Sequence, residues 1–403
     1  MQTINRTQLF RASCLALLVT SLSFGIRAGI LDKLGTDFQL DKTQLSSITA
    51  TAFWGFPLAV VIGGMIVDII GMKRLLVLAF LFHLTGIVLT IFAQGFWTLF
   101  ISTLTIGIAN GTVEAACNPL VTTIYSDNKA TKLNHFHLWF PGGIFIGTLI
   151  VLLFTKLNLS WQIQVGVMLI PALIYGYLFS KLDFPVTERV ASGVSMGGMY
   201  KALLSPLFIF MFFCMCATGI TELYTEQWVP VLLKSIGNPI LIVTATSGVM
   251  VLGRGLAKPI LKQFAPQTVL LMSTTVAAVG LYLLYSATGN VFIDAIIFGI
   301  GVCFFWPTML GFVNTNIPKT GALGLNLMGG AGMFSVSVYT IFMGRYYDSI
   351  VNAGGDTTTA GHDVLHLTLY IPIGLIVAFA GLVFYMKSRG NTKPLSDTEV
   401  AAV

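Results

Sequence analysis

The chain has 403 residues, of which 55% are hydrophobic and only 9% are Asp, Glu, Lys or Arg. Charged residues make up about 25% of a soluble domain, so this composition excludes an ordinary soluble enzyme and a disordered chain. The net charge of +6 does not indicate a nucleic-acid partner, because the basic residues lie mostly in short segments between apolar runs and not in one stripe. We therefore predict an all-α polytopic membrane protein that is embedded in a lipid bilayer.

Apolar runs long enough to cross a bilayer as a helix, about 20 residues each, recur along the whole chain. We predict twelve transmembrane helices, at residues 10–31, 44–69, 75–94, 97–125, 135–155, 161–181, 203–233, 239–261, 267–287, 290–315, 321–344 and 366–387. The first run follows Arg6 and Arg11 and is longer than the apolar part of a signal peptide, so we interpret it as a transmembrane helix.

The distribution of basic residues predicts how these helices are oriented. Most of the 22 Lys and Arg residues fall in connections that share one side of the membrane with both chain ends. Because positively charged connections stay on the inner side, we assign both termini to the cytoplasm. The expected location is the plasma membrane, which is the inner membrane if the source is a Gram-negative bacterium.

The longest inner connection divides the predicted helices six and six. We predict an N-terminal six-helix bundle over 1–181, a cytoplasmic linker over 182–202, and a C-terminal six-helix bundle with a short cytoplasmic tail over 203–403. Matching dipeptides about 190 residues apart, Gly25-Ile26 and Gly219-Ile220, indicate that the halves are duplicated. Duplicated halves of this kind enclose a central cavity and favour alternating access.

The connection between the second and third predicted helices has a distinctive pattern. Residues 64–74 have the sequence GMIVDIIGMKR, which resembles the GxxxDxxGxxK/R loop of the major facilitator superfamily. Gly71 makes the turn in this interpretation, and Asp68, at a helix end, can pair with a basic residue while one side of the protein is closed. The resemblance implies a gating role for Gly64, Asp68, Gly71 and Arg74. A tight turn flanked by topology-setting basic residues is the alternative.

The fourth predicted helix shows a more specific resemblance. Residues 111–119 have the sequence GTVEAACNP and are followed by Leu133-Asn134. They resemble helix 4 and the next loop of the fucose/glucose/galactose:proton symporters, the fucose permease-like family. The second half continues the resemblance at Gly253-Arg254, Phe264-Ala265-Pro266 and Trp306-Pro307-Thr308.

This resemblance implies a major facilitator fold with twelve transmembrane helices in two pseudo-symmetric six-helix bundles. It also implies proton-coupled import of a neutral monosaccharide, with Glu114 as a functional carboxylate. Arg254 lies in the segment of the second half that matches residues 64–74, so it is a further predicted gating residue. The family's proton-linked aspartate in helix 1 has no counterpart between Gly25 and Ala28. Coupling through two acids of the N-terminal half is therefore not carried over.

Three polar residues of the fourth helix, Asn110, Glu114 and Asn118, are spaced four residues apart, so they share one helix face. A carboxylate is costly in lipid, and this face is therefore expected to line a cavity. Burial favours the protonated form of a carboxyl group, so Glu114 is predicted to couple transport to a proton, and the two asparagines are predicted to bind substrate. A structural carboxyl that bonds to a neighbouring helix is the alternative.

The seventh predicted helix carries Glu222, Glu226 and Trp228. The two glutamates would repel on a shared face unless a cation or a proton intervenes. Glu222 is predicted to couple a proton and to bind substrate, and Glu226 and Trp228 are further predicted substrate-binding residues. For the glutamates, solvation in an outer vestibule is the alternative. Trp306 can stack on a sugar ring, although tryptophan is also common in interfacial belts, and His137 near the start of the fifth helix completes the predicted substrate-binding residues.

Arg27, in the outer half of the first helix, is the clearest deep basic residue. A guanidinium does not deprotonate in proteins, so it must find an anion or extend to the membrane surface. Three interpretations stay open. Arg27 pairs internally with Glu114 or Glu222, it recognises a carboxylate or phosphate on the substrate, or it reaches the surface.

These observations together predict a secondary active transporter, a symporter of a monosaccharide (hexose or deoxyhexose) with a proton, working by alternating access. The alternative is a proton- or sodium-coupled transporter of an anionic substrate, a sugar acid or organic acid that Arg27 recognises. An enzyme is not predicted, because the chain has no HExxH or GxSxG motif. The five cysteines all lie in apolar stretches, so no metal site and no cofactor are predicted. A monomer is expected.

Overall fold

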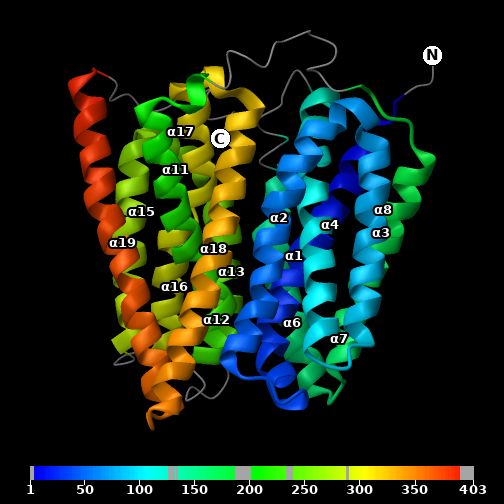
Figure 1. Cartoon of the computed structure of the whole chain (residues 1–403). Helices are drawn as coiled ribbons and strands as arrows, with labels where there is room; N and C mark the ends of the chain where they lie inside the picture. Colours follow the sequence, from blue (N-terminus) through cyan, green and yellow to red (C-terminus); the bar gives the residue numbers. More distant parts are fainter. Residues whose placement is uncertain are drawn as a thin grey trace. The chain divides into compact units, whose positions relative to one another are not determined.

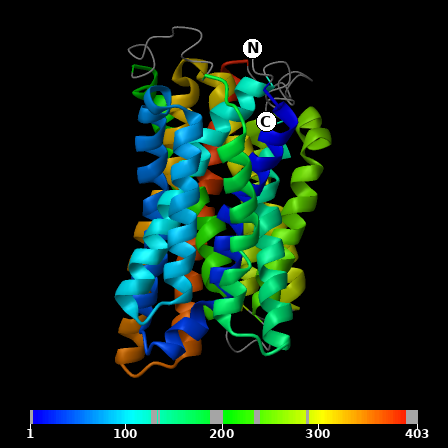
Figure 2. The ribbon, with the colours of Figure 1, turned by 90° about the vertical axis from the view of Figure 1, so that its right-hand side faces the viewer.

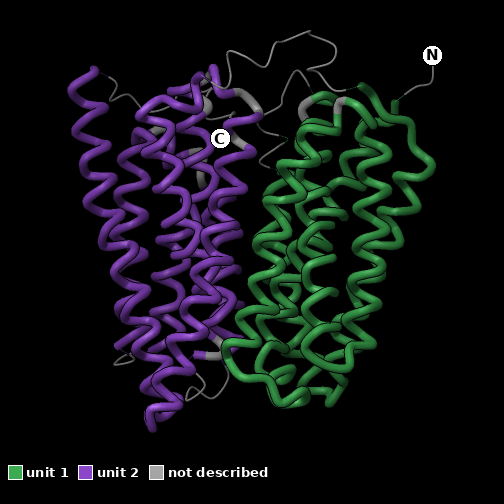
Figure 3. Tube along the Cα trace, viewed as in Figure 1, with its two compact units in different colours: residues 1–196 green, residues 197–403 purple. Residues whose placement is uncertain are grey.

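The computed structural model describes residues 4–125, 132, 135–186, 201–232, 239–286 and 290–390. Contacts divide the chain into two compact units, unit 1 over residues 1–196 and unit 2 over residues 197–403 (Figure 3). The division falls within the predicted linker at 182–202, most of which lies outside the described residues, so the linker stays a prediction. Every regular element in the described ranges is a helix.

Unit 1 is a bundle whose helices run alongside one another (Figures 1 and 2). Its helices are α1 (Arg6–Asp37), α2 (Lys42–Ile70), α3 (Met72–Ile91), α4 (Phe96–Ile124), α6 (Trp139–Lys156), α7 (Trp161–Gly166) and α8 (Leu169–Lys181). The helices α7 and α8 together form one apolar span, Trp161–Lys181. The main packing pairs are α1 with α6, α2 with α4 and α3 with α4.

Unit 2 repeats this plan. Its elements are α11 (Pro206–Gly219), a π-helical turn η1 (Ile220–Tyr224), α12 (Thr225–Leu232), α13 (Ile240–Gly255), α14 (Ala257–Gln263), α15 (Pro266–Ser286), α16 (Val291–Val302), α17 (Phe305–Asn316), a 3-10 turn η2 (Pro318–Thr320), α18 (Gly321–Asn352) and α19 (Thr357–Ser388). The pairs α11 with α18, α13 with α16 and α15 with α16 correspond to the three pairs of unit 1. The predicted fold of two pseudo-symmetric helical bundles is confirmed.

The duplicated glycines mark the same helix contact in each unit. At Gly25, α1 approaches α6 so closely that a Cβ atom would lie 2.5 Å from the carbonyl oxygen of Ile144. In unit 2, a Cβ atom on Gly219 would lie 2.9 Å from the carbonyl oxygen of Gly332 in α18. Small residues allow helix backbones in a membrane to pack this closely. The sequence repeat therefore reflects a repeated packing requirement.

The described residues contain 11 helices that are long and apolar enough to cross a membrane, and Ile240–Gly255 is a shorter apolar helix. In chain order they correspond to the twelve predicted spans. The last one begins earlier than predicted, at Thr357 instead of near residue 366. Its start is set by a polar cap, because the carboxylate of Asp356 accepts the backbone N–H groups of Thr358 and Thr359 at 2.8 Å.

Proline interrupts the predicted span 290–315 and separates it into α16 and α17. Pro307 has no N–H group, and its ring excludes the carbonyl four residues earlier, that of Cys303, from the helix hydrogen-bond ladder. The break therefore leaves the Cys303 carbonyl oxygen available to another donor. In the predicted span 203–233, the π-helical turn η1 separates α11 from α12.

Candidate functional site

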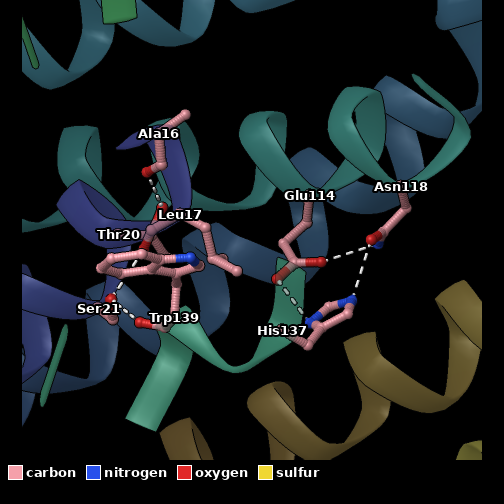
Figure 4. Close-up of polar contacts among 8 residues, drawn as sticks. All are labelled: Ala16, Leu17, Thr20, Ser21, Glu114, Asn118, His137 and Trp139. Atoms are coloured by element: carbon pink, nitrogen blue, oxygen red, sulfur yellow. Dashed lines mark hydrogen bonds and ion pairs between the residues drawn. The ribbon is translucent and has the colours of Figure 1, made fainter. Parts of the chain in front are cut away.

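Glu114 lies in α4 and is held by two polar side chains (Figure 4). Asn118, one turn further along the helix, donates from Nδ2 to Glu114 Oε2 at 2.8 Å. His137, just before α6, places Nδ1 3.9 Å from Glu114 Oε1 and Nε2 3.0 Å from Asn118 Oδ1. We call Glu114, Asn118 and His137 the Glu114 cluster. It brings together three of the residues predicted from the sequence, with Glu114 buried at its centre.

The first turn of α6 is fixed to α1 beside this cluster (Figure 4). The hydroxyl of Ser21 donates to the carbonyl oxygen of Trp139 at 2.9 Å. Gly143, one turn later, packs directly against Ser21, so that a Cβ atom there would overlap the hydroxyl. His137 stands two residues before Trp139, and this contact between α1 and α6 therefore holds the imidazole near α4.

The hydrogen bonds of the Glu114 cluster determine where its protons lie. Because the Asn118 amide nitrogen donates to Glu114, the amide oxygen accepts from His137 Nε2. A neutral imidazole then carries its proton on Nε2, and its Nδ1 faces the carboxylate as a second acceptor. One added proton, on Glu114 or on His137 Nδ1, converts this contact between two acceptors into an attraction. A role of the cluster in proton coupling stays a prediction.

Asn110, predicted to share a face with Asn118, belongs to a different group. Its Oδ1 is 2.8 Å from His83 Nε2, and its Nδ2 donates to the Ser23 hydroxyl at 3.2 Å. His83 Nδ1 is in turn 2.7 Å from the Tyr175 hydroxyl. A helix turns about 100° per residue, so side chains eight residues apart differ in direction by about 80°. Asn110 therefore points into the core of unit 1 and joins α1, α3, α4 and α8.

Arg27 is buried inside unit 1. Its guanidinium carbon lies 4.9 Å from the ring centroid of Phe24 and 5.8 Å from that of Phe53, which gives favourable cation–π contacts. Arg27 also lines a cavity of about 30 Å³ together with Thr90 and Thr103, which is room for about two water molecules. The predicted internal ion pair and the predicted anion site of Arg27 both stay predictions.

Glu222 lies on the π turn of unit 2 and forms an ion pair with Arg254 of α13. The distance from Arg254 Nη2 to Glu222 Oε1 is 3.2 Å, and the two side chains are 13% and 2% exposed. Arg254 Nε also donates to the Cys303 carbonyl oxygen at 3.1 Å, the carbonyl that Pro307 removes from the helix ladder. The predicted gating residue Arg254 thus ties the π turn to α13 and to the break between α16 and α17.

The other predicted residues of unit 2 lie at helix contacts. Glu226 is 6% exposed, and its Oε1 has no hydrogen-bond partner among the described residues. Trp228 is buried and stacks on Tyr224, with ring centroids 6.2 Å apart. Trp306 packs against α18, where a Cβ atom on Gly332 would lie 3.0 Å from Trp306 Cζ3. Both tryptophans therefore have packing roles within unit 2, and a role in substrate binding stays a prediction.

The turn between α2 and α3 is made by Gly71, whose φ of +85° is one that L side chains rarely adopt. Its N–H group donates to the Val67 carbonyl oxygen at 2.9 Å. Arg74 is exposed in the first turn of α3. The side chain of Asp68 lies outside what the structure describes, so its gating contact stays a prediction.

Gly63, one of several glycines at the contact between α2 and α4, is not among the residues predicted from the sequence. A Cβ atom on Gly63 would lie 2.7 Å from Cβ of Ala115 in α4, whereas the predicted residue Gly64 is the half-buried neighbour. Two adjacent glycines give no sequence signal that tells which one faces the partner helix. The contact next to Glu114 is therefore known only from the packing.

The amino-acid sequence is similar to one protein family and to several known transporters. Residues 13–341 match the family model of the Major Facilitator Superfamily. The solute carrier family 2 facilitated glucose transporter member 10 of Xenopus laevis is 28% identical over 162 residues, which are 40% of this chain and 29% of that protein. The protein of the same name from Danio rerio is 27% identical over 164 residues, 40% of this chain and 32% of that protein. The chain thus aligns with less than a third of the length of these relatives.

Two solved structures share the fold. The D-xylose-proton symporter superposes with a TM-score of 0.73 at 12% identity, over 91% of this chain and 97% of that chain. The nucleoside transporter NupG superposes with a TM-score of 0.70 at 15% identity, over 93% of this chain and 99% of that chain. The family match covers most of the chain and agrees with the two repeated helical units. This chain therefore belongs to the major facilitator superfamily of membrane transporters.

Proposed function

We propose that this protein is a secondary active transporter that imports a monosaccharide, a hexose or a deoxyhexose, together with a proton. The observation that carries the proposal is the Glu114 cluster. A buried carboxylate in a membrane-spanning helix bonds to an amide, Asn118, and lies 3.9 Å from an imidazole, His137, neither of which carries a permanent charge. An ionisable group that is buried within a membrane-spanning helix is expected to have a role in transport.

Two further observations support a sugar as the substrate. The relatives named above include a facilitated glucose transporter and a D-xylose-proton symporter. Sugar hydroxyls need fixed donors and acceptors, and most of a binding pocket's remaining wall is apolar or aromatic. The Glu114 cluster of unit 1 supplies an amide and an imidazole for such hydroxyls. We assign Asn118 and His137 to the sugar in the loaded state.

The proposed cycle uses one proton. Protonation removes the negative charge from the Glu114 cluster, and this lowers the cost of moving the loaded site between its two exposed states. Release of sugar and proton to the cytoplasm then restores the charge. Protonation of Glu222, the other predicted coupling residue, would instead deprive the partly buried Arg254 of its carboxylate partner. We therefore assign the transported proton to Glu114 and a structural role to the Glu222–Arg254 pair.

Transport into proteoliposomes tests this function. One pH unit corresponds to 1.36 kcal/mol, so a sugar carried with one proton accumulates about 10-fold across a gradient of that size. We expect this accumulation for the hexose or deoxyhexose that stabilises the purified protein. Glu114→Gln should abolish accumulation but keep exchange of labelled sugar, because the glutamine still hydrogen-bonds and carries no charge.

Asp294→Asn is the matched control, because Asp294 is a buried carboxyl of unit 2 outside the Glu114 cluster. It should accumulate sugar like the unmodified protein. Undiminished accumulation by Glu114→Gln would contradict the assignment of the proton. A sugar that binds the protein but never crosses the vesicle membrane would contradict transport itself.

A sugar acid or organic acid is the second candidate substrate, because Arg27 lines a cavity and a guanidinium suits a carboxylate. Ligands that bind the folded state raise its unfolding temperature. If anions are the substrate, sugar acids should stabilise the protein, and Arg27→Gln should lose that effect. Stabilisation of both proteins by the same neutral sugar, and by no acid, would exclude the anionic substrate.

A further inference from the structure

Unit 2 contains a buried carboxylate that the proposed cycle does not use. Glu226 follows the π turn in α12 and is 6% exposed. Its Oε1 has no hydrogen-bond partner among the described residues, and neither has the buried hydroxyl of the adjacent Thr225. Burial of an unpartnered polar atom costs free energy, and burial of an unpaired charge costs more. This part of unit 2 therefore favours a positively charged partner.

Both side chains line one small cavity. Its volume is about 10 Å³, and its third polar wall residue is Thr246 of α13. The rest of the wall is apolar and consists of Val229, Ile242, Val243, Leu284 and Phe298. This volume is about that of one water-sized sphere. The cavity therefore has room for one water molecule or one small ion. Side-chain oxygens line one part of its wall.

The hydroxyl of Thr246 is arranged to accept and not to donate inside this cavity. The hydroxyl donates its hydrogen bond to the carbonyl oxygen of Ala295, at 3.3 Å. A hydroxyl with its proton committed elsewhere keeps its lone pairs for a cation. The cavity wall therefore offers a carboxylate oxygen of Glu226 and the hydroxyl oxygens of Thr225 and Thr246, and oxygen ligands are those that hard cations prefer.

The charges nearby leave Glu226 unbalanced. Glu222 and Arg254 act on Glu226 with opposite signs, and they are paired with each other at 3.2 Å. That pair is neutral as a whole, so among the described residues an ionised Glu226 adds one negative charge that no ion pair compensates. The adjacent π turn is a rare element that concentrates at functional sites, and interrupted helices hold ions in many transporters.

We propose that Glu226, Thr225 and Thr246 bind one sodium ion inside unit 2. The ion neutralises Glu226, satisfies the two hydroxyl oxygens and holds α12 against α13. This inference goes beyond the proposed function, because the site is separate from the Glu114 cluster and its occupancy requires neither sugar nor a proton gradient. Glu226 is then an ion ligand and not a substrate contact.

The test is the unfolding temperature of the purified full chain without sugar, at neutral pH and constant ionic strength. Replacing potassium chloride by sodium chloride should raise this temperature in a saturable way. Glu226→Gln should abolish the sodium effect. Thr246→Val should weaken the apparent sodium affinity about 10-fold, as expected for one lost contact to a charge. Thr244→Val is the matched control, since Thr244 is on the same helix, bonds to the Ile240 carbonyl and lies outside the cavity wall.

Three results would overturn the proposal. In the first, sodium and potassium give the same unfolding temperature and only pH changes it, which would mean that Glu226 is simply protonated. In the second, Glu226→Gln keeps the sodium effect. The third applies if Glu226→Gln does not fold: the unfolding temperature of Thr246→Val then depends on sodium concentration in the same way as that of the control Thr244→Val. Because no sugar is present, any of these outcomes leaves the proposed transport function intact, and a failed transport assay leaves the sodium site intact.

Discussion

The two units pair their helices in the same way but hold their buried acids differently. In unit 1, Glu114 accepts from Asn118 and lies beside His137. In unit 2, Glu222 is bound by the guanidinium of Arg254 at 3.2 Å. The first carboxylate can gain a proton and keep its amide partner, whereas the second loses an ion pair when it is protonated. Duplication has thus supplied one scaffold for two kinds of electrostatic site.

The two units also differ in the polar groups that join their helices, a hydrogen-bond network in unit 1 and an ion pair in unit 2. Unit 1 is crossed by a neutral network in which the Tyr175 hydroxyl, His83, Asn110 and Ser23 follow one another. The corresponding interior of unit 2 contains the Glu222–Arg254 pair and the unpartnered oxygen of Glu226. Neutral networks fix a core without depending on bound ions. We accordingly assign the proposed sodium ion to unit 2 and the proposed transported proton to unit 1.

The largest effect is expected from breaking the ion pair of unit 2. Arg254→Gln should lower the free energy of unfolding by about 3–5 kcal/mol, because it leaves Glu222 buried without its partner. The double variant Glu222→Gln with Arg254→Gln should regain most of this loss. Denaturant unfolding of the purified protein measures both. Equal stability of Arg254→Gln and the unmodified chain would show that the pair does not hold unit 2 together.

An intermediate effect is expected at the repeated glycine contact. Gly25→Ala and Gly219→Ala should each cost about 1–3 kcal/mol through overpacking. Gly25→Ala should cost more, because its Cβ atom would lie 2.5 Å from a carbonyl oxygen against 2.9 Å at Gly219. Gly142→Ala is the control, since a Cβ atom there meets nothing within 4 Å. The same unfolding measurement checks all three, and a neutral Gly25→Ala would refute the close contact in unit 1.

The smallest effect is expected in the neutral network of unit 1. Tyr175→Phe removes the hydroxyl that lies 2.7 Å from His83 Nδ1 and should cost about 1 kcal/mol, the net value of one hydrogen bond. Tyr177→Phe, at a side chain that is 64% exposed, should be neutral. If Tyr175→Phe lowered the free energy of unfolding as much as Arg254→Gln does, the proposed difference between the two units would be wrong.

Hydropathy predicts the fold well because the length of an apolar run is set by the thickness of the bilayer. It cannot predict where a helix ends outside the apolar layer, and the cap at Asp356 therefore places the start of α19 earlier than residue 366. It also cannot predict local breaks. The proline at position 307 is visible in the sequence, but the use of the Cys303 carbonyl by Arg254 depends on packing.

The candidate site is predictable only where contacts are local. Glu114 and Asn118 are one helical turn apart, so their shared face follows from spacing. Arg254 and Glu222 are 32 residues apart along the chain, and no spacing rule joins them. Thr225 and Thr246 are ordinary helix residues in the sequence. Their importance appears only with the cavity that they line together with Glu226.

The most direct test of the central claim is the number of protons that the purified protein takes up from weakly buffered solution when it binds sugar, followed with a pH indicator. We expect about one proton per bound sugar for the unmodified chain, none for Glu114→Gln, and the unmodified value for the double variant of Glu222 and Arg254. Proton uptake by Glu114→Gln equal to that of the unmodified chain, or its loss only in the double variant, would contradict the assignment of the transported proton to unit 1.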